Sequence, residues 1–120
     1  MTRADLGRTG EAVAARYYQK QGYLLLAHNY RTRMGELDLV LKKGDLIVIC
    51  EVKTRSPGAP VSGREAVDQR KQRRILAAAS QYLAASPFRD CPVRLDVAEV
   101  MPRPQGGWLV HCIENAFIAG

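Results

Sequence analysis

The sequence lacks any long apolar run and carries no recognisable targeting segment. In its 120 residues, no hydrophobic stretch approaches the roughly 20 residues that a membrane-spanning helix requires. The N-terminal residues are polar and do not form the apolar core of a signal peptide. These absences argue against membrane insertion and secretion, so we expect a cytoplasmic location and no membrane partner.

Patterns typical of structural zinc sites are missing as well. The three cysteines, Cys50, Cys91 and Cys112, are odd in number and widely spaced, and no Cys-x-x-Cys pair occurs. Neither His28 nor His111 lies at ligand spacing from them. The sequence therefore predicts three reduced thiols and disfavours a zinc site.

Positive charge is in excess, because 18 lysines and arginines face 12 acidic residues, for a net charge of +6. Such an excess favours polyanionic partners, since neutralising phosphates releases counterions. Hydrophobic residues at 47% and charged residues at 25% are ordinary for a soluble globular protein. A chain of this length builds one modest core, so we expect a single domain over residues 1–120.

Apolar periodicity and turn residues predict an alternation of helices and strands. A helix is expected over residues 5–21, ended by Gly22, and Gly44-Asp45 is a hairpin signal between two apolar runs. Ser62 and Glu65 fit a capping box that opens a second helix, ending near residue 85 before Pro87. Strands are expected over residues 23–31, 36–41, 46–53, 92–101 and 108–113. The predicted order is α-β-β-β-α-β-β.

Four ionisable residues lie on the two strands of the predicted hairpin. Side chains alternate along a strand, so Glu36 and Asp38 share one face, as do Glu51 and Lys53. With Gly44 and Asp45 as the central turn residues, Asp38 faces Glu51, and Glu36 faces Lys53. The hairpin therefore predicts a single patch with acids and a lysine.

Two facing carboxylates repel each other, and a hard divalent ion such as Mg²⁺ or Mn²⁺ relieves the repulsion. A lysine beside them can orient or deprotonate a water molecule, which suits phosphodiester hydrolysis. We therefore predict Asp38, Glu51 and Lys53 as catalytic residues. The alternative is a solvated face with ordinary ion pairs, but Glu51 follows the apolar run 46–50, and charges that end a buried strand indicate a site.

The order of an acidic residue, a gap and then an acid-x-lysine triplet resembles the motif of the PD-(D/E)xK nuclease superfamily. Leu37 stands where the name of that superfamily expects proline. More specifically, the chain resembles the YraN-like family of small bacterial proteins, which is similar in layout to archaeal Holliday junction resolvases. The resembling segments are Gly10-Glu11, Gly35-Glu36-Leu37-Asp38-Leu39, Glu51-Val52-Lys53-Thr54-Arg55, Ala66-Val67-Asp68, Lys71-Gln72-Arg73-Arg74 and Arg94-Leu95-Asp96-Val97. The resemblance implies a restriction-endonuclease-like three-layer α/β fold, with a mixed central sheet flanked by helices.

The resemblance also implies an endonuclease that acts on DNA, including branched or structured DNA. Asp38 and Glu51 would bind the metal, with Glu11 as an additional acid and with Glu36 and Gln72 as supporting residues. For Glu11, a plain solvent-facing glutamate favoured by the helix dipole is the alternative. Asp96 is expected to pair with a neighbouring arginine instead of a metal.

Basic residues are concentrated in the second helix and beside the acidic motifs. They are predicted to contact phosphates without reading sequence, with DNA preferred over RNA. The alternative is a solvated cationic face, and the corresponding functional alternative is a nucleic-acid-binding or partner-binding module without turnover. Junction cutting needs two active sites, which a symmetric homodimer would supply. The residues are Arg31, Arg33, Arg55, Arg70, Arg73 and Arg74.

Overall fold

A computed structural model describes residues 3–56 and 67–117, with side chains from Thr9 onward. The order of helices and strands is the one predicted from the sequence. In neither helix of these ranges does an apolar stretch reach the length needed to cross a membrane. The elements are α1 (Arg3–Gln19), β1 (Leu24–Arg31), β2 (Glu36–Lys43), β3 (Leu46–Thr54), α2 (Gln69–Ala84), β4 (Val93–Pro102) and β5 (Trp108–Ile113).

The five strands form one mixed sheet in the order β1-β2-β3-β4-β5. Strands β3 and β4 pair in parallel, and the other neighbours pair antiparallel. Parallel neighbours need a long crossover connection, and α2 lies within the segment that links β3 to β4. The mixed sheet agrees with the expectation from the sequence.

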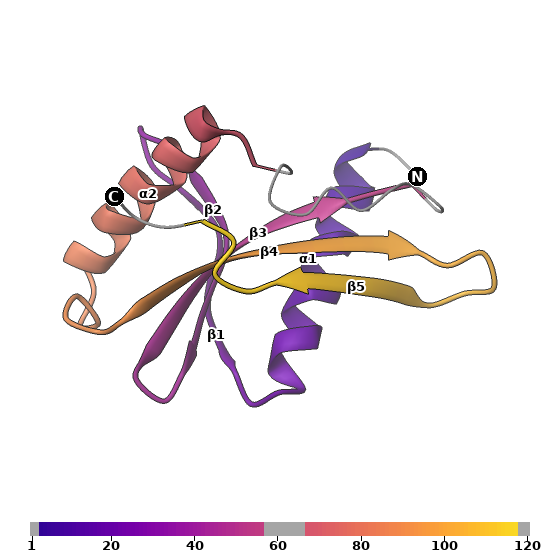
Figure 1. Cartoon of the computed structure of the whole chain (residues 1–120), viewed down its shortest axis with the longest axis horizontal. Helices are drawn as coiled ribbons and strands as arrows, with labels where there is room; N and C mark the ends of the chain where they lie inside the picture. Colours follow the sequence, from indigo (N-terminus) through magenta and orange to yellow (C-terminus); the bar gives the residue numbers. More distant parts are fainter. Residues whose placement is uncertain (1–2, 57–66, 118–120) are drawn as a thin grey trace.

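The two helices cover opposite faces of the sheet, which gives three layers (Figure 1). Ile47 and Ile49 of β3 pack in one apolar cluster with Ile75 of α2. Val48 and Cys50 of the same strand pack in another with Tyr18 of α1. Because successive side chains of a strand point to opposite faces, each helix has its own core.

Helix α1 lies close against the sheet. A Cβ atom at Gly10 would collide with Thr54 Oγ1 and lie 2.9 Å from Val100 Cγ2, so only glycine fits there. The helix ends at Gln19, and Gly22 follows with a φ of 92°. Gly22 therefore allows the chain to turn into β1, close to the predicted end of the helix.

Helix α2 begins later than predicted, and the cap is a different residue. Asp68 is the N-cap, and its Oδ1 accepts a hydrogen bond of 2.8 Å from the Lys71 amide. Val67 is buried in the α2-side core and is not helical, so tertiary burial sets the start of the helix. The Gln72 side chain donates to the Val67 carbonyl at 2.9 Å and holds this turn together. The predicted capping box at residues 62–65 lies outside the described residues.

The hairpin register is confirmed, but its ladder is shorter than predicted. Pairing runs from Lys43 opposite Leu46 to Leu39 opposite Cys50 and ends there in the described residues. Asp38 therefore has no backbone pairing with Glu51, and Glu36 has none with Lys53. The reason is local: the Val52 amide donates to the Asp38 side chain at 2.9 Å, where a ladder would need a main-chain partner. The end of β3 pairs with β4 alone.

Candidate active site

A cleft of about 540 Å³ opens between the sheet and α2, where β2 and β3 stop pairing. It contains both acids of the predicted site, Asp38 and Glu51, although their strands are no longer bonded to each other here. The lining also includes the turn before β2 and the first turn of α2. The lining residues are Gly35, Glu36, Asp38, Glu51, Asp68, Arg70, Lys71, Arg74 and Ile75.

Asp38 and Glu51 bring two carboxyl groups together in a poorly solvated place. Glu51 is only 5% exposed. Burial, together with the negative charge of Glu51, raises the pKa of Asp38 to about 8, against the lowering effect of the Val52 amide. The acid pair therefore holds a proton up to a higher pH than an isolated carboxyl group would, as expected when two like charges share a site.

Two lysines approach the same oxygen of Glu51. Lys71 Nζ lies 2.5 Å from Glu51 Oε1, and Lys53 Nζ lies 4.0 Å from it. Burial and the neighbouring Lys71 ammonium lower the pKa of Lys53. For Lys71, burial lowers the pKa, but hydrogen bonds with Glu51 and Lys53 outweigh burial and raise it. The proton is thus held more tightly on Lys71 than on Lys53.

Lys71 belongs to the basic run of the second helix and was not among the predicted catalytic residues, although no other described lysine or arginine lies closer to Glu51. Its position on the helix suggested the apolar side, near Val67 and Ile75. The apolar side of α2 faces the sheet, and the end of β3, which carries Glu51, lies next to it in the cleft. The sequence feature that could have revealed this contact is Asp68. As the N-cap it places Lys71 in the first turn of α2, close to the end of β3.

Glu11 lies beside the acid pair and not among its members. It lines a separate pocket of about 290 Å³ with His28 and Asn29. Burial raises the pKa of Glu11, a hydrogen bond with Asn29 lowers it, and the charge of Glu11 contributes to the raised pKa of Asp38. In the described ranges, no set of three or more His, Cys, Asp and Glu side chains is arranged to hold a metal ion. Asp38 and Glu51 are therefore a two-carboxylate site.

The turn between β1 and β2 closes one end of the cleft. Thr32 Oγ1 accepts hydrogen bonds from the amides of Met34 and Gly35, at 3.0 and 3.1 Å. A Cβ atom at Gly35 would lie 2.8 Å from the Arg74 carbonyl oxygen, so the turn touches the backbone of α2. The Arg74 side chain donates to the Met34 carbonyl at 3.2 Å. These contacts fix α2 at the site.

The predicted basic and supporting residues do not all reach the cleft. Arg70 and Arg74 line it, whereas Arg73 and Arg33 are exposed outside the lining. Nε of the exposed Arg31 lies 3.8 Å from Glu36 Oε2. The ion-pair partner of Glu36 is therefore this arginine, whereas the sequence had predicted that Glu36 faces Lys53.

Two further predicted residues have other partners. Arg55 bonds the buried Glu99 at 3.1 Å. The Gln72 amide contacts the start of its own helix, and its support for the acids is therefore indirect.

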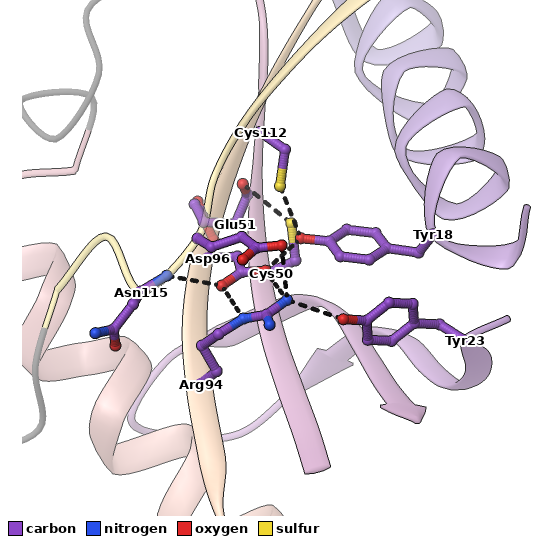
Figure 2. Close-up of polar contacts among 9 residues, drawn as sticks. Tyr18, Tyr23, Cys50, Glu51, Arg94, Asp96, Cys112 and Asn115 are labelled. Carbon is purple, nitrogen blue, oxygen red and sulfur yellow. Dashed lines mark hydrogen bonds and ion pairs between the residues drawn. The ribbon is translucent and has the colours of Figure 1, made fainter. Parts of the chain in front are cut away.

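A second buried acid lies on the opposite face of the sheet, and its partners are different. Asp96 is fully buried and accepts hydrogen bonds from Tyr18 at 2.7 Å, from Nε and Nη2 of Arg94 at 2.9 Å each, and from the Asn115 amide at 3.0 Å. Figure 2 shows these groups converging on its carboxylate. The predicted arginine partner of Asp96 is confirmed, and this cluster is structural.

Comparison with known proteins gives one consistent family. The family model described as "Uncharacterised protein family UPF0102" matches residues 10–100. A UPF0102 protein of Symbiobacterium thermophilum is 42% identical over 95% of this chain and 97% of its own length. One from a Parafrankia species is 45% identical, over 93% and 95%. One from Alkaliphilus metalliredigens is 40% identical, over 94% and 97%. These names state no activity.

Proposed function

The chain belongs to the uncharacterised protein family UPF0102, the YraN-like family that its motifs resembled, and we propose that it is a Mg²⁺- or Mn²⁺-dependent endonuclease that hydrolyses DNA. Branched or otherwise structured DNA is the proposed substrate class, and a restriction-endonuclease-like sandwich is the proposed fold. One observation carries the proposal: Asp38 and Glu51 lie together in a cleft that arginines also line, and two lysines approach Glu51.

The donor set suits a hard divalent ion. Mg²⁺ is commonly held by one or two carboxylates and completes its shell with water. Asp38 and Glu51 would hold it, and a cation there would relieve the repulsion that raises the pKa of Asp38. When bound, such an ion supplies a nucleophilic water at neutral pH and polarises a phosphoryl oxygen.

The chain's own residues would position and stabilise the reacting groups. Lys53 is half-buried beside Glu51, and its lowered pKa suits a group that orients a water molecule or accepts its proton. As an ammonium, it would stabilise the charge that develops on the phosphoryl oxygens. Arg70 and Arg74 would hold the DNA backbone in the cleft through its phosphates.

A cleavage assay tests the proposal. Purified protein with Mn²⁺ is incubated with four labelled substrates: a four-way junction, a flap, a single strand and a duplex. We expect cleavage of at least one, with a loss of about 10²-fold or more in Asp38→Asn and in Lys53→Met. Lys20→Met, which removes an exposed lysine after α1, serves as the matched control. Failure to cut any substrate, or cutting that survives both substitutions, would refute catalysis.

A second candidate function is nucleic-acid binding without turnover on the same fold. The observation that favours it is the ion pair of Lys71 with Glu51, because that pair already neutralises one acid of the site. This candidate predicts salt-sensitive DNA binding that needs no metal. Calorimetric titration with Mn²⁺ separates the two functions: binding that is lost in Asp38→Asn supports the enzyme.

A further inference from the structure

The contact between Lys71 and Glu51 has the geometry of a strong, partly buried ion pair. Its 2.5 Å separation is much shorter than the 4.0 Å between Lys53 and the same oxygen, Glu51 Oε1. Glu51 is 5% exposed, so water solvates its charge only weakly. A buried carboxylate of this kind is costly without a cation, and among the described residues Lys71 is the nearest one.

The Lys71 backbone is held in place, whereas its side chain is long, flexible and partly exposed. Its amide is held by the Asp68 cap, and α2 is held against the turn at Gly35. The ammonium is at the end of a flexible four-carbon chain, and the side chain is 43% exposed in the cleft. Arg70 and Arg74 line the same cleft, so a phosphate bound there would attract the ammonium as well.

We propose that Lys71 competes with a divalent ion for Glu51 Oε1, and that the phosphate backbone of DNA removes this competition by drawing the ammonium into the cleft. This inference rests on the proposed function, in which Asp38 and Glu51 hold the ion. A divalent ion and an ammonium repel each other, so both cannot occupy positions against one carboxylate oxygen at full strength. It follows by linkage that DNA and metal strengthen each other's binding.

Metal affinity without any turnover is the test. Mn²⁺ is titrated calorimetrically into the wild type, Lys71→Met and Lys71→Arg, each alone and with an uncleavable phosphorothioate duplex. We expect Mn²⁺ to bind about 5-fold or more tighter to Lys71→Met than to the wild type, and DNA to tighten Mn²⁺ binding by a similar factor in the wild type only. Lys71→Arg keeps a cation at Glu51 and should stay close to the wild type. Lys20→Met is the control for net charge.

The possible outcomes distinguish a failure of the Lys71 competition from a failure of the proposed nuclease function. Equal or weaker Mn²⁺ binding by Lys71→Met refutes the competition, while wild-type binding that Asp38→Asn abolishes leaves the proposed function standing. Binding by Lys71→Met but not by the wild type alone supports the competition, and a wild type that binds no Mn²⁺ even with DNA refutes its metal dependence. If neither binds Mn²⁺, both ideas are refuted. Should Lys71→Met fail to fold, Lys71→Gln, which can still donate a hydrogen bond to Glu51, replaces it.

Discussion

Two of the buried-acid clusters lie on opposite faces of one sheet, and they differ in how their charge is compensated. Asp96 accepts four hydrogen bonds, two of them from the Arg94 guanidinium. Asp38 accepts one from the Val52 amide and faces a second carboxyl group. An acid whose lone pairs are all engaged holds the fold together, whereas an acid left with an unfavourable neighbour can take a ligand. On the proposed function, this difference distinguishes an acid that stabilises the fold from the acids that would hold a metal ion.

The largest expected effect comes from removing the compensated acid. Asp96→Ala leaves the Tyr18 hydroxyl and the Arg94 guanidinium without their shared acceptor in a buried place. We expect a loss of about 3–5 kcal/mol in the free energy of unfolding, measured by urea denaturation. Asp90→Ala, at an exposed position, should change it by less than about 0.5 kcal/mol. A loss in Asp96→Ala no larger than in this control would remove the distinction between the clusters.

A smaller effect should appear in the pH dependence of stability. The pKa of Asp38 is about 8 in the folded protein and 3.8 as a reference. Between these values the folded state binds more protons than the unfolded state, so the free energy of unfolding falls as pH rises. Asp38→Asn has no such proton and should flatten this decline. Urea denaturation at several pH values measures it, and a wild-type slope that matches Asp38→Asn would contradict the raised pKa.

The smallest expected effect concerns the cations around the site of Asp38 and Glu51. If Arg70 contacts one phosphate of DNA, Arg70→Ala should weaken binding and reduce the slope of log K against log salt by about 1. Arg16→Ala, exposed on the other helix, should leave that slope unchanged. Fluorescence anisotropy with a labelled duplex at several salt concentrations measures both. Equal slopes for the two variants would place DNA elsewhere on the molecule.

Local patterns predicted much of this architecture because they depend on few residues. The two-residue turn at Gly44-Asp45 and the alternation of side chains were enough to set the register of β2 and β3. The place where this ladder ends was not predictable, because it depends on the Asp38 side chain capturing the Val52 amide.

The start of α2 and the role of Lys71 were missed for a related reason. A capping box is a local motif, whereas the observed start of α2 depends on the burial of Val67 in the core between α2 and the sheet. The contact of Lys71 with Glu51 joins a helix to a strand 20 positions away along the chain. Such a contact exists only once the layers have assembled.

The hairpin turn at Gly44-Asp45 has a consequence for how this protein tolerates change. Both acids are placed by counting outward along two strands from that one bend. Exchanging one apolar residue for another in these strands leaves the count intact. A single inserted residue would slide one strand against the other and rotate an acid to the far side of the sheet. Chain length at the bend, more than the identity of the residues around it, is therefore what keeps the two carboxyl groups together.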